Sequence, residues 1–301
     1  MTFRANQSSL LLAALFATFA SLAQAQTQSK VDVRLPLKDK SVRFAVIGDS
    51  GTGEKDQYEV AKQMETYRQT VGFDFVIMLG DNIYAGHEPR DFAKKFEVPY
   101  KPLLDAGVKF YASLGNHDDP KLEPLYKPFN MNGERYYTFK KGYIQFFALD
   151  SNYMDAQQLT WLEQNLRSSK AQWKICFFHH PLYNEGKMHG PDLDLRNQLS
   201  PLLKSYGVNV VFSGHEHAYE RLKPVDNIYY FVQGDSGKLS RHDFHRSSQM
   251  AASFDGARTF MVVEVVGDTL YFQTISQDGK TVDSGGLSRA AATVKAASTG
   301  H

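Results

Sequence analysis

Five apolar runs in this chain each end in a short polar stretch, and this repeated pattern constrains the fold more than any other feature of the sequence. The most informative stretch is Gly80-Asp81-Asn82-Ile83-Tyr84, which follows an apolar run at residues 75–79. Such a run predicts a buried strand. The two carboxylate oxygens of Asp81 can bridge two cations, and a phenolate from Tyr84 suits a hard ion such as Fe(III). Taken alone, an aspartate after a strand is also explained as a turn or helix-cap residue.

Four further stretches repeat this arrangement: Gly48-Asp49-Ser50-Gly51, Gly115-Asn116-His117-Asp118, His179-His180-Pro181 and Gly214-His215-Glu216-His217. In open α/β sheets, ligands bind outside the carboxyl ends of the strands. Each stretch by itself has a structural explanation, such as a capping carboxylate, a turn asparagine or a buried histidine. Five of them together favour a shared functional site at one sheet edge.

The order of the elements predicts an α/β fold. Strands are expected at residues 42–47, 75–79, 108–114, 136–139, 143–149, 173–178, 208–212, 228–232, 259–265 and 270–275, with Gly267-Asp268 as a hairpin turn. Helices are expected at residues 56–70, 155–167 and 192–205, and a partly helical segment at 90–106. Strands alternate with helices early in the chain and form hairpins late, which indicates mixed sheets.

Composition supports one globular domain. The chain has 301 residues, of which 42% are hydrophobic and 22% charged, and its formal net charge of +1 gives no indication of a nucleic-acid-binding surface. No linker-like composition interrupts residues 41–286, so this range is predicted to be one domain, preceded by a polar, loose lead-in at 26–40. The Ala/Ser/Thr-rich tail at 287–301 is predicted to be disordered. Cys176 is the single cysteine, which rules out an intramolecular disulfide, and its apolar surroundings predict a small buried hydrophobe.

The N-terminus predicts export. Arg4 precedes an apolar run at residues 10–22 and then Ala23-Gln24-Ala25, which is the pattern of a signal peptide at residues 1–25. The run is too short for a spanning helix, although an uncleaved anchor is the alternative. We expect cleavage after Ala25 and a location in the periplasm or the medium, with no membrane span in the mature chain. N-terminal sequencing of the extracytoplasmic protein checks this, and a retained Met1 would contradict it.

Together, the five polar stretches resemble those of the metallophosphoesterases of the calcineurin-like superfamily. Tyr84 is typical of the purple acid phosphatases within that superfamily. The resemblance runs from about residue 42 to 275. The chain's size and His189-Gly190-Pro191 are similar to the small, tartrate-resistant type, whereas Ala218-Tyr219-Glu220-Arg221 is more similar to the large plant enzymes. The fold implied is a four-layer sandwich of two mixed β-sheets flanked by helices, with the metals at one sheet edge.

The resemblance implies a dinuclear centre with seven ligands. Asp49, Tyr84 and His217 would hold Fe(III). Asn116, His179 and His215 would hold the second ion, Fe(II), Zn(II) or Mn(II), and Asp81 would bridge the two. Two carboxylates and a phenolate supply three negative charges against the five positive charges of the two metal ions. The centre therefore stays net positive even with a bridging hydroxide, which suits a negatively charged phosphate ester. Two metals can also clamp the attacking and leaving oxygens and supply a metal-bound hydroxide as nucleophile.

Two further histidines match family positions near the substrate. His117 matches the acid that protonates the leaving group, and Asp118 would favour its charged form if the carboxylate turned that way. His189 matches a histidine that contacts substrate, if the loop here is one residue longer, and an exposed loop histidine is the alternative. His180 is assigned no role, and His87 is either an exposed loop residue or a substrate contact.

Three other functions remain open from the sequence. The predicted activity is a secreted phosphatase acting on small phosphomonoesters, but the same two-metal core serves phosphodiesterases. A non-catalytic metal- or phosphate-binding protein would require a broken ligand set, and none of the seven positions is broken. A redox side activity of an iron pair is compatible with the same residues. Neither the natural substrate nor the oligomeric state can be read from the sequence.

Overall fold

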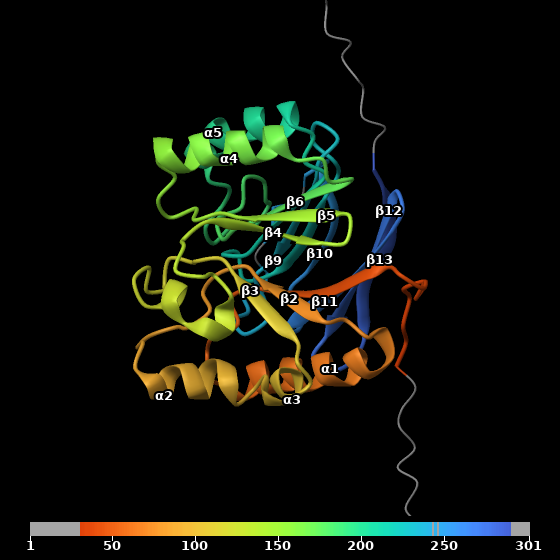
Figure 1. Ribbon diagram of the computed structural model, residues 1–301. Coiled ribbons are helices and arrows are strands. Elements are labelled where there is room, and N and C mark those ends of the chain that lie inside the picture. Colours follow the sequence, from red (N-terminus) through yellow and green to blue (C-terminus); the bar gives the residue numbers. More distant parts are fainter. Residues whose placement is uncertain (1–30, 243, 246, 290–301) are drawn as a thin grey trace, which may run out of the picture. The chain divides into compact units, whose positions relative to one another are not determined.

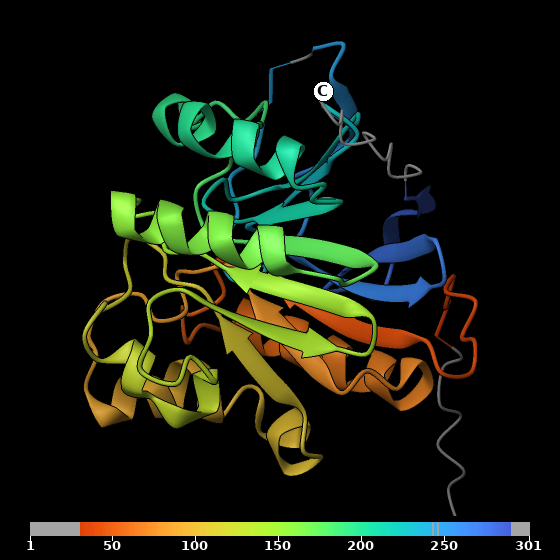
Figure 2. The same ribbon diagram turned by 45° about the horizontal axis from the view of Figure 1, so that its top comes forward.

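Two β-sheets pack face to face, and helices cover their outer faces. The computed structural model describes residues 31–242, 244–245 and 247–289, so the predicted signal peptide and the part of the predicted tail from residue 290 lie outside the described residues. Leu287 and Ser288, which were predicted to belong to that tail, are instead the last two residues of a strand. Helices α4 (Ala156–Ser168) and α5 (Leu193–Ser205) lie on one side of the sheet pair (Figure 1). Helices α1 (Lys55–Val71), α2 (Pro89–Phe92) and α3 (Lys101–Asp105) lie on the other side, as a second view also shows (Figure 2). The predicted four-layer α/β sandwich of two mixed sheets is therefore confirmed.

The first sheet has the strand order β13-β12-β11-β1-β2-β3. Its members are β1 (Val42–Ile47), β2 (Phe75–Met78), β3 (Lys109–Ala112), β11 (Thr259–Val266), β12 (Thr269–Ser276) and β13 (Thr281–Ser288). Strands β1, β2 and β3 are parallel neighbours, and β11 pairs with β1 in the antiparallel sense. The carboxyl ends of β1, β2 and β3 consequently share one edge of the sheet.

The second sheet has the strand order β10-β8-β9-β7-β6-β5-β4. Its members are β4 (Tyr137–Lys141), β5 (Ile144–Ala148), β6 (Trp173–Phe177), β7 (Val210–Ser213), β8 (Tyr219–Leu222), β9 (Tyr229–Gln233) and β10 (Met250–Phe254). Strands β5, β6, β7 and β9 are parallel, while β4, β8 and β10 are antiparallel to their neighbours.

The alternation of side chains along the strands builds two cores. Phe146 on β5 points to the first sheet, where its ring meets that of Phe44 edge to face at 5.3 Å. Its neighbour Phe147 belongs instead to the apolar cluster under α4 and α5, with Cys176 and Phe178. Strands buried on both faces read as continuous apolar runs, which is why these were readily predicted. Cys176 is fully buried, as predicted, and burial raises the pKa of its thiol.

Three strands were not predicted: β8, β10 and β13. They are edge or near-edge strands without a continuous apolar run: β8 and β13 contain charged residues, β10 contains two alanines and a serine, and β13 contains two adjacent glycines. A side-chain contact between distant segments supports two of them: Arg221 on β8 donates to Asp283 on β13 across the two sheets at 2.8 Å. Residues 31–40 form neither helix nor strand, but Leu35 is buried and the backbone N–H groups of Leu37 and Lys38 donate to Glu264. Within the described residues no helix is long and apolar enough to cross a membrane.

Candidate metal centre

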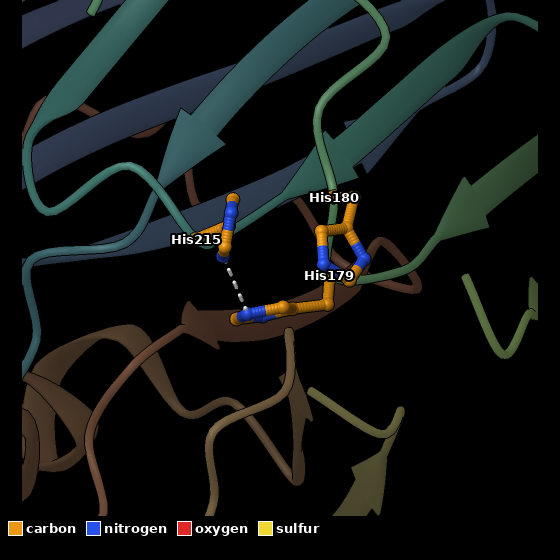
Figure 3. A group of neighbouring side chains, drawn as sticks. All are labelled: His179, His180 and His215. Carbon is orange, nitrogen blue, oxygen red and sulfur yellow. Dashed lines mark hydrogen bonds between the residues drawn. The ribbon is translucent and has the colours of Figure 1, made fainter. Parts of the chain in front are cut away.

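The polar stretches predicted from the sequence meet where the two sheets present their carboxyl ends. Asp49, Asp81 and Asn116 follow β1, β2 and β3, while His179 and His215 follow β6 and β7. Figure 3 shows His179, His180 and His215 gathered at the ends of β6 and β7. Residues from segments up to 166 positions apart in sequence thus come into hydrogen-bond range, as the bond from the His215 N–H to Asp49 shows.

Asp49, Tyr84 and His217 form one half of the centre. The Tyr84 hydroxyl lies 3.2 Å from Asp49 Oδ1 and 3.3 Å from His217 Nε2. The same His217 nitrogen lies 3.5 Å from Asp49 Oδ1. Burial, and then the charge of Asp81, raise the pKa of Asp49 well above its usual range. Burial and both carboxylates likewise raise the pKa of Tyr84, so a phenolate there requires a nearby cation.

His179, Asn116 and His215 form the other half. The Nδ1 of His179 lies 2.9 Å from the backbone carbonyl oxygen of Leu79, which can only accept, so Nδ1 carries the proton and Nε2 presents a lone pair. That lone pair faces Asn116 Oδ1 at 3.0 Å and His215 Nδ1 at 3.1 Å. Burial lowers the pKa of His179 well below its usual range and that of His215 to about 2, so both rings are neutral at ordinary pH.

Asp81 lies between the two halves. Its Oδ1 lies 3.5 Å from His179 Nε2, and ligand atoms of Asp49, Asp81 and His179 all lie within 4.8 Å of one another. The same Oδ1 accepts a hydrogen bond from the His117 backbone N–H at 3.0 Å. Of the candidate ligands, Asp81 therefore has the placement expected of a residue shared by two ions.

The donor set fits two cations. His179 Nε2 faces an amide oxygen, a second imidazole nitrogen and a carboxylate oxygen, and a single proton cannot satisfy all of these lone pairs at once. Buried groups in such a cluster repel one another unless a cation neutralises them. Nitrogen and oxygen ligands together suit zinc, iron or manganese. The structure therefore brings all seven predicted ligands into an arrangement that fits metal ions.

Local backbone strain supports this reading. Asp49, Asp81 and His215 have positive φ angles of 53°, 51° and 70°, which are uncommon for residues other than glycine. Such strain clusters at functional sites, where the surrounding structure stabilises it. A Cβ atom on Gly115 would lie 2.2 Å from Asp81 Oδ1, and one on Gly214 would lie 2.4 Å from Asp49 Oδ2. These two glycines allow the strand ends to approach the carboxylates.

Both predicted catalytic histidines border the centre. The His117 ring lies 4.8 Å from the Tyr84 ring, and the His189 ring lies 4.0 Å from the His215 ring and 5.9 Å from that of His217. Both side chains are exposed to solvent. Each is thus next to the ligand cluster without being enclosed by it.

Asp118 does not support His117 as considered from the sequence. Its carboxylate is buried and turned inward, where Oδ1 accepts from the Ile83 N–H and Oδ2 from the Gly115 N–H and Asn82 Nδ2. It holds the two ligand-bearing loops together. His87 is half-buried, and its Nε2 lies 3.4 Å from Glu123 Oε1.

Sequence reasoning missed three residues around the centre. The His180 ring lies 4.5 Å from that of His215, and its Nδ1 lies 2.8 Å from Ser151 Oγ. The Lys238 ammonium lies 4.7 Å from the Tyr84 ring centroid. Glu216, between two predicted ligands, is fully buried. The sequence did contain a signal for Glu216, because it is a charged residue between the histidines of Gly214-His215-Glu216-His217. No such signal marked Lys238.

The comparisons with known proteins agree with this geometry. Residues 42–219 match the model of the calcineurin-like phosphoesterase family, and the chain belongs to that family. Among curated proteins it is similar to purple acid phosphatase 17 of Arabidopsis thaliana, with 29% identity over 80% of this chain and 81% of that protein. It is also similar to the tartrate-resistant acid phosphatase type 5 of Rattus norvegicus, with 24% identity over 83% of this chain and 91% of that protein.

A solved structure shares the fold. The purple acid phosphatase PPD1 from yellow lupin seeds superposes with a TM-score of 0.69 and 19% identity, covering 85% of this chain and 55% of that chain. The predicted resemblance to the purple acid phosphatases, including the tartrate-resistant type, is therefore confirmed.

Proposed function

We propose that this chain is an exported phosphatase that hydrolyses small phosphomonoesters at a dinuclear metal centre. The proposal rests on the lone pair of His179 Nε2, which faces Asn116, His215 and Asp81. The Leu79 carbonyl oxygen accepts from Nδ1 and thereby fixes the tautomer of the His179 ring. Asp49, Tyr84 and His217 would hold one ion, Asn116, His179 and His215 the other, and Asp81 both. When bound, the two ions supply Lewis acidity and lower the pKa of a coordinated water.

The chain's own residues position the substrate and move a proton. His117 is fixed through its backbone N–H on Asp81, so its ring stays beside the centre without taking a ligand position. As an imidazolium it would donate a proton to the oxygen of the departing alcohol. The His189 ring lies 4.0 Å from the His215 ring, and His189 also lines a cavity of about 640 Å³ with Tyr183, Lys187 and Arg196. This cavity offers room for the organic part of a substrate, and His189 would contact the phosphate beside it.

We further propose that Tyr84 binds Fe(III). Its hydroxyl is the one phenol in contact with both Asp49 and His217 among the described residues. A phenolate on Fe(III) absorbs visible light by charge transfer, so the metal-loaded protein is expected to be coloured. Tyr84→Phe keeps the ring and removes the oxygen, and is expected to abolish the visible band.

Metal analysis combined with a visible spectrum tests this assignment. Tyr183→Phe is a matched control, because that phenol is half-buried but lies outside the ligand cluster. A wild-type protein with stoichiometric iron and no colour would contradict the proposal, as would a Tyr84→Phe variant that keeps the band. Parallel assays with p-nitrophenyl phosphate and bis(p-nitrophenyl) phosphate separate a monoesterase from a diesterase.

A further inference from the structure

Glu216 is a buried carboxylate whose hydrogen bonds reach one loop. It lies between His215 and His217, and its side chain is fully buried. Oε1 accepts from the Met188 N–H at 3.2 Å, and Oε2 accepts from the N–H groups of His189 at 3.1 Å and Gly190 at 3.3 Å. Three successive backbone donors converging on one carboxylate form charge-assisted bonds, which are stronger than neutral ones.

Further contacts tie the same loop, residues 184–190, to the segment that carries His215 and His217. The Asn184 side-chain amide is buried and donates to Glu216 Oε2 at 3.1 Å. A second fully buried carboxylate, Glu220 on β8, accepts from the Glu185 N–H at 2.8 Å. Gly186 passes so close that a Cβ atom there would lie 2.1 Å from Glu216 Cδ. The backbone of the loop is thus fitted around the Glu216 side chain.

This attachment decides where His189 lies. The His189 N–H is one of the groups that Glu216 accepts from, and the His189 ring lies 4.0 Å from the His215 ring. His215 and Glu216 are adjacent in the chain, so the carboxylate links the position of the His189 ring to that of a predicted metal ligand. Since the loop is otherwise exposed around Lys187 to His189, its conformation depends on these buried contacts.

We infer that Glu216, supported by Glu220 and Gly186, is a positioning residue that holds the loop 184–190 so that His189 contacts the substrate. The inference rests on the proposed function for the role of His189. Weakening the attachment lowers the fraction of molecules with His189 in place, and the apparent affinity for substrate falls by the same fraction. The metal ions should be unaffected, because Glu216 itself is turned toward the loop and offers its oxygens to N–H groups.

Glu216→Gln in the full metal-loaded chain tests the inference. The variant keeps the shape of the side chain but removes its charge and one acceptor oxygen. We expect both metals to be retained, KM for p-nitrophenyl phosphate to rise roughly tenfold, as for a loop in place in about one molecule in ten, and kcat to change less. Hydrogen–deuterium exchange of the peptide over residues 184–192 should become faster, because exchange follows the fraction of molecules in which the loop is open.

A double variant and a matched control sharpen the result. In a His189→Ala background, Glu216→Gln should raise KM by less than about twofold further, because the two residues act through one contact.

Glu264→Gln is the control: Glu264 is also fully buried and accepts two loop N–H groups, from Leu37 and Lys38, but on the other sheet. It should alter neither KM nor exchange over residues 184–192.

The outcomes separate the inference from the function it rests on. Unchanged exchange in Glu216→Gln, loss of a metal, or fully additive effects with His189→Ala would each overturn the inference. Faster exchange in Glu216→Gln with no change of KM in His189→Ala would leave the attachment standing and refute the proposed role of His189. If Glu216→Gln does not fold, Gly186→Ala approaches the same contact from the loop side and should give faster exchange and a higher KM, with both metals bound; normal exchange in that variant would count against the inference.

Discussion

Asp81→Ala is expected to release both metal ions and to lower kcat/KM by at least about 10³-fold, because the ions supply charge stabilisation that is typically worth this much or more. Asp81 lies between the two halves of the centre, with Oδ1 3.5 Å from His179 Nε2 and close to Asp49. Its removal deprives each ion of an anionic ligand at once. The measurement is metal content per chain by elemental analysis after dialysis, followed by activity.

Asn116→Ala provides the contrast. Its Oδ1 faces only the half that contains His179, at 3.0 Å, so this variant should lose mainly the ion of that half. Equal retention of both ions in Asp81→Ala and Asn116→Ala would show that Asp81 does not bridge.

Asp235→Asn is the matched control for the Asp81 experiment. Asp235 is another fully buried carboxyl, and burial raises its pKa to about 8. Its Oδ1 is bonded to Gln233 and Thr259, and it contributes no atom to the ligand cluster. Because it is largely protonated below that pKa, an amide replaces it with little electrostatic change. Both metals should remain bound at acidic pH, so a loss there would mean that any buried substitution disrupts the centre.

His117→Ala is expected to lower kcat on alkyl phosphates by about 10²–10⁴-fold with both metals still bound, the range typical of a positioned general acid. An alkoxide is a poor leaving group unless it is protonated, and His117 borders the centre without holding a ligand position. The p-nitrophenolate group departs with little protonation, so the loss on p-nitrophenyl phosphate should be small. The comparison of kcat on the two substrate types is therefore the decisive measurement.

His87→Ala serves as the control for this ratio, because that side chain is directed to Glu123 rather than to the ligand cluster. The ratio of the two kcat values should be unchanged in His87→Ala. Equal losses on both substrates in His117→Ala would show that His117 is not the acid.

Much of the fold could be predicted because its central strands are buried on both faces. The run Phe75–Met78 is apolar throughout, and Trp173–Phe177 is apolar except for Lys174. Each run continues for one more apolar residue before Gly80 or His179 marks the point where the chain leaves the core. The helix at Ala156–Ser168 was recognised from its periodic leucines and from Asp155, whose side chain does cap it by accepting from the Gln158 N–H. Such local signals are independent of the remainder of the chain.

Strands β8, β10 and β13 and the segment before β1 were not predictable in this way. Strands β8 and β13 pair with β9 and β12, their neighbours along the chain, but their sequences lack a continuous apolar run. They are tied together by the bond between Arg221 and Asp283, 62 positions apart, and no local pattern contains that information. The same holds for residues 31–40, whose predicted looseness contrasts with backbone bonds to Glu264 more than 220 positions away.

By itself, the sequence determined which residues are available as ligands and where each is placed on its strand, because a strand end and the chemistry of its side chains are local properties. Only the tertiary structure decided how those residues face one another. It turned Asp118 inward to join two ligand loops, and it placed Glu216, which reads as a spacer between two histidines, under the loop that carries His189. The physical reason is that the partner of a buried charge is set by packing between distant segments, and neither spacing nor composition records which segments will meet.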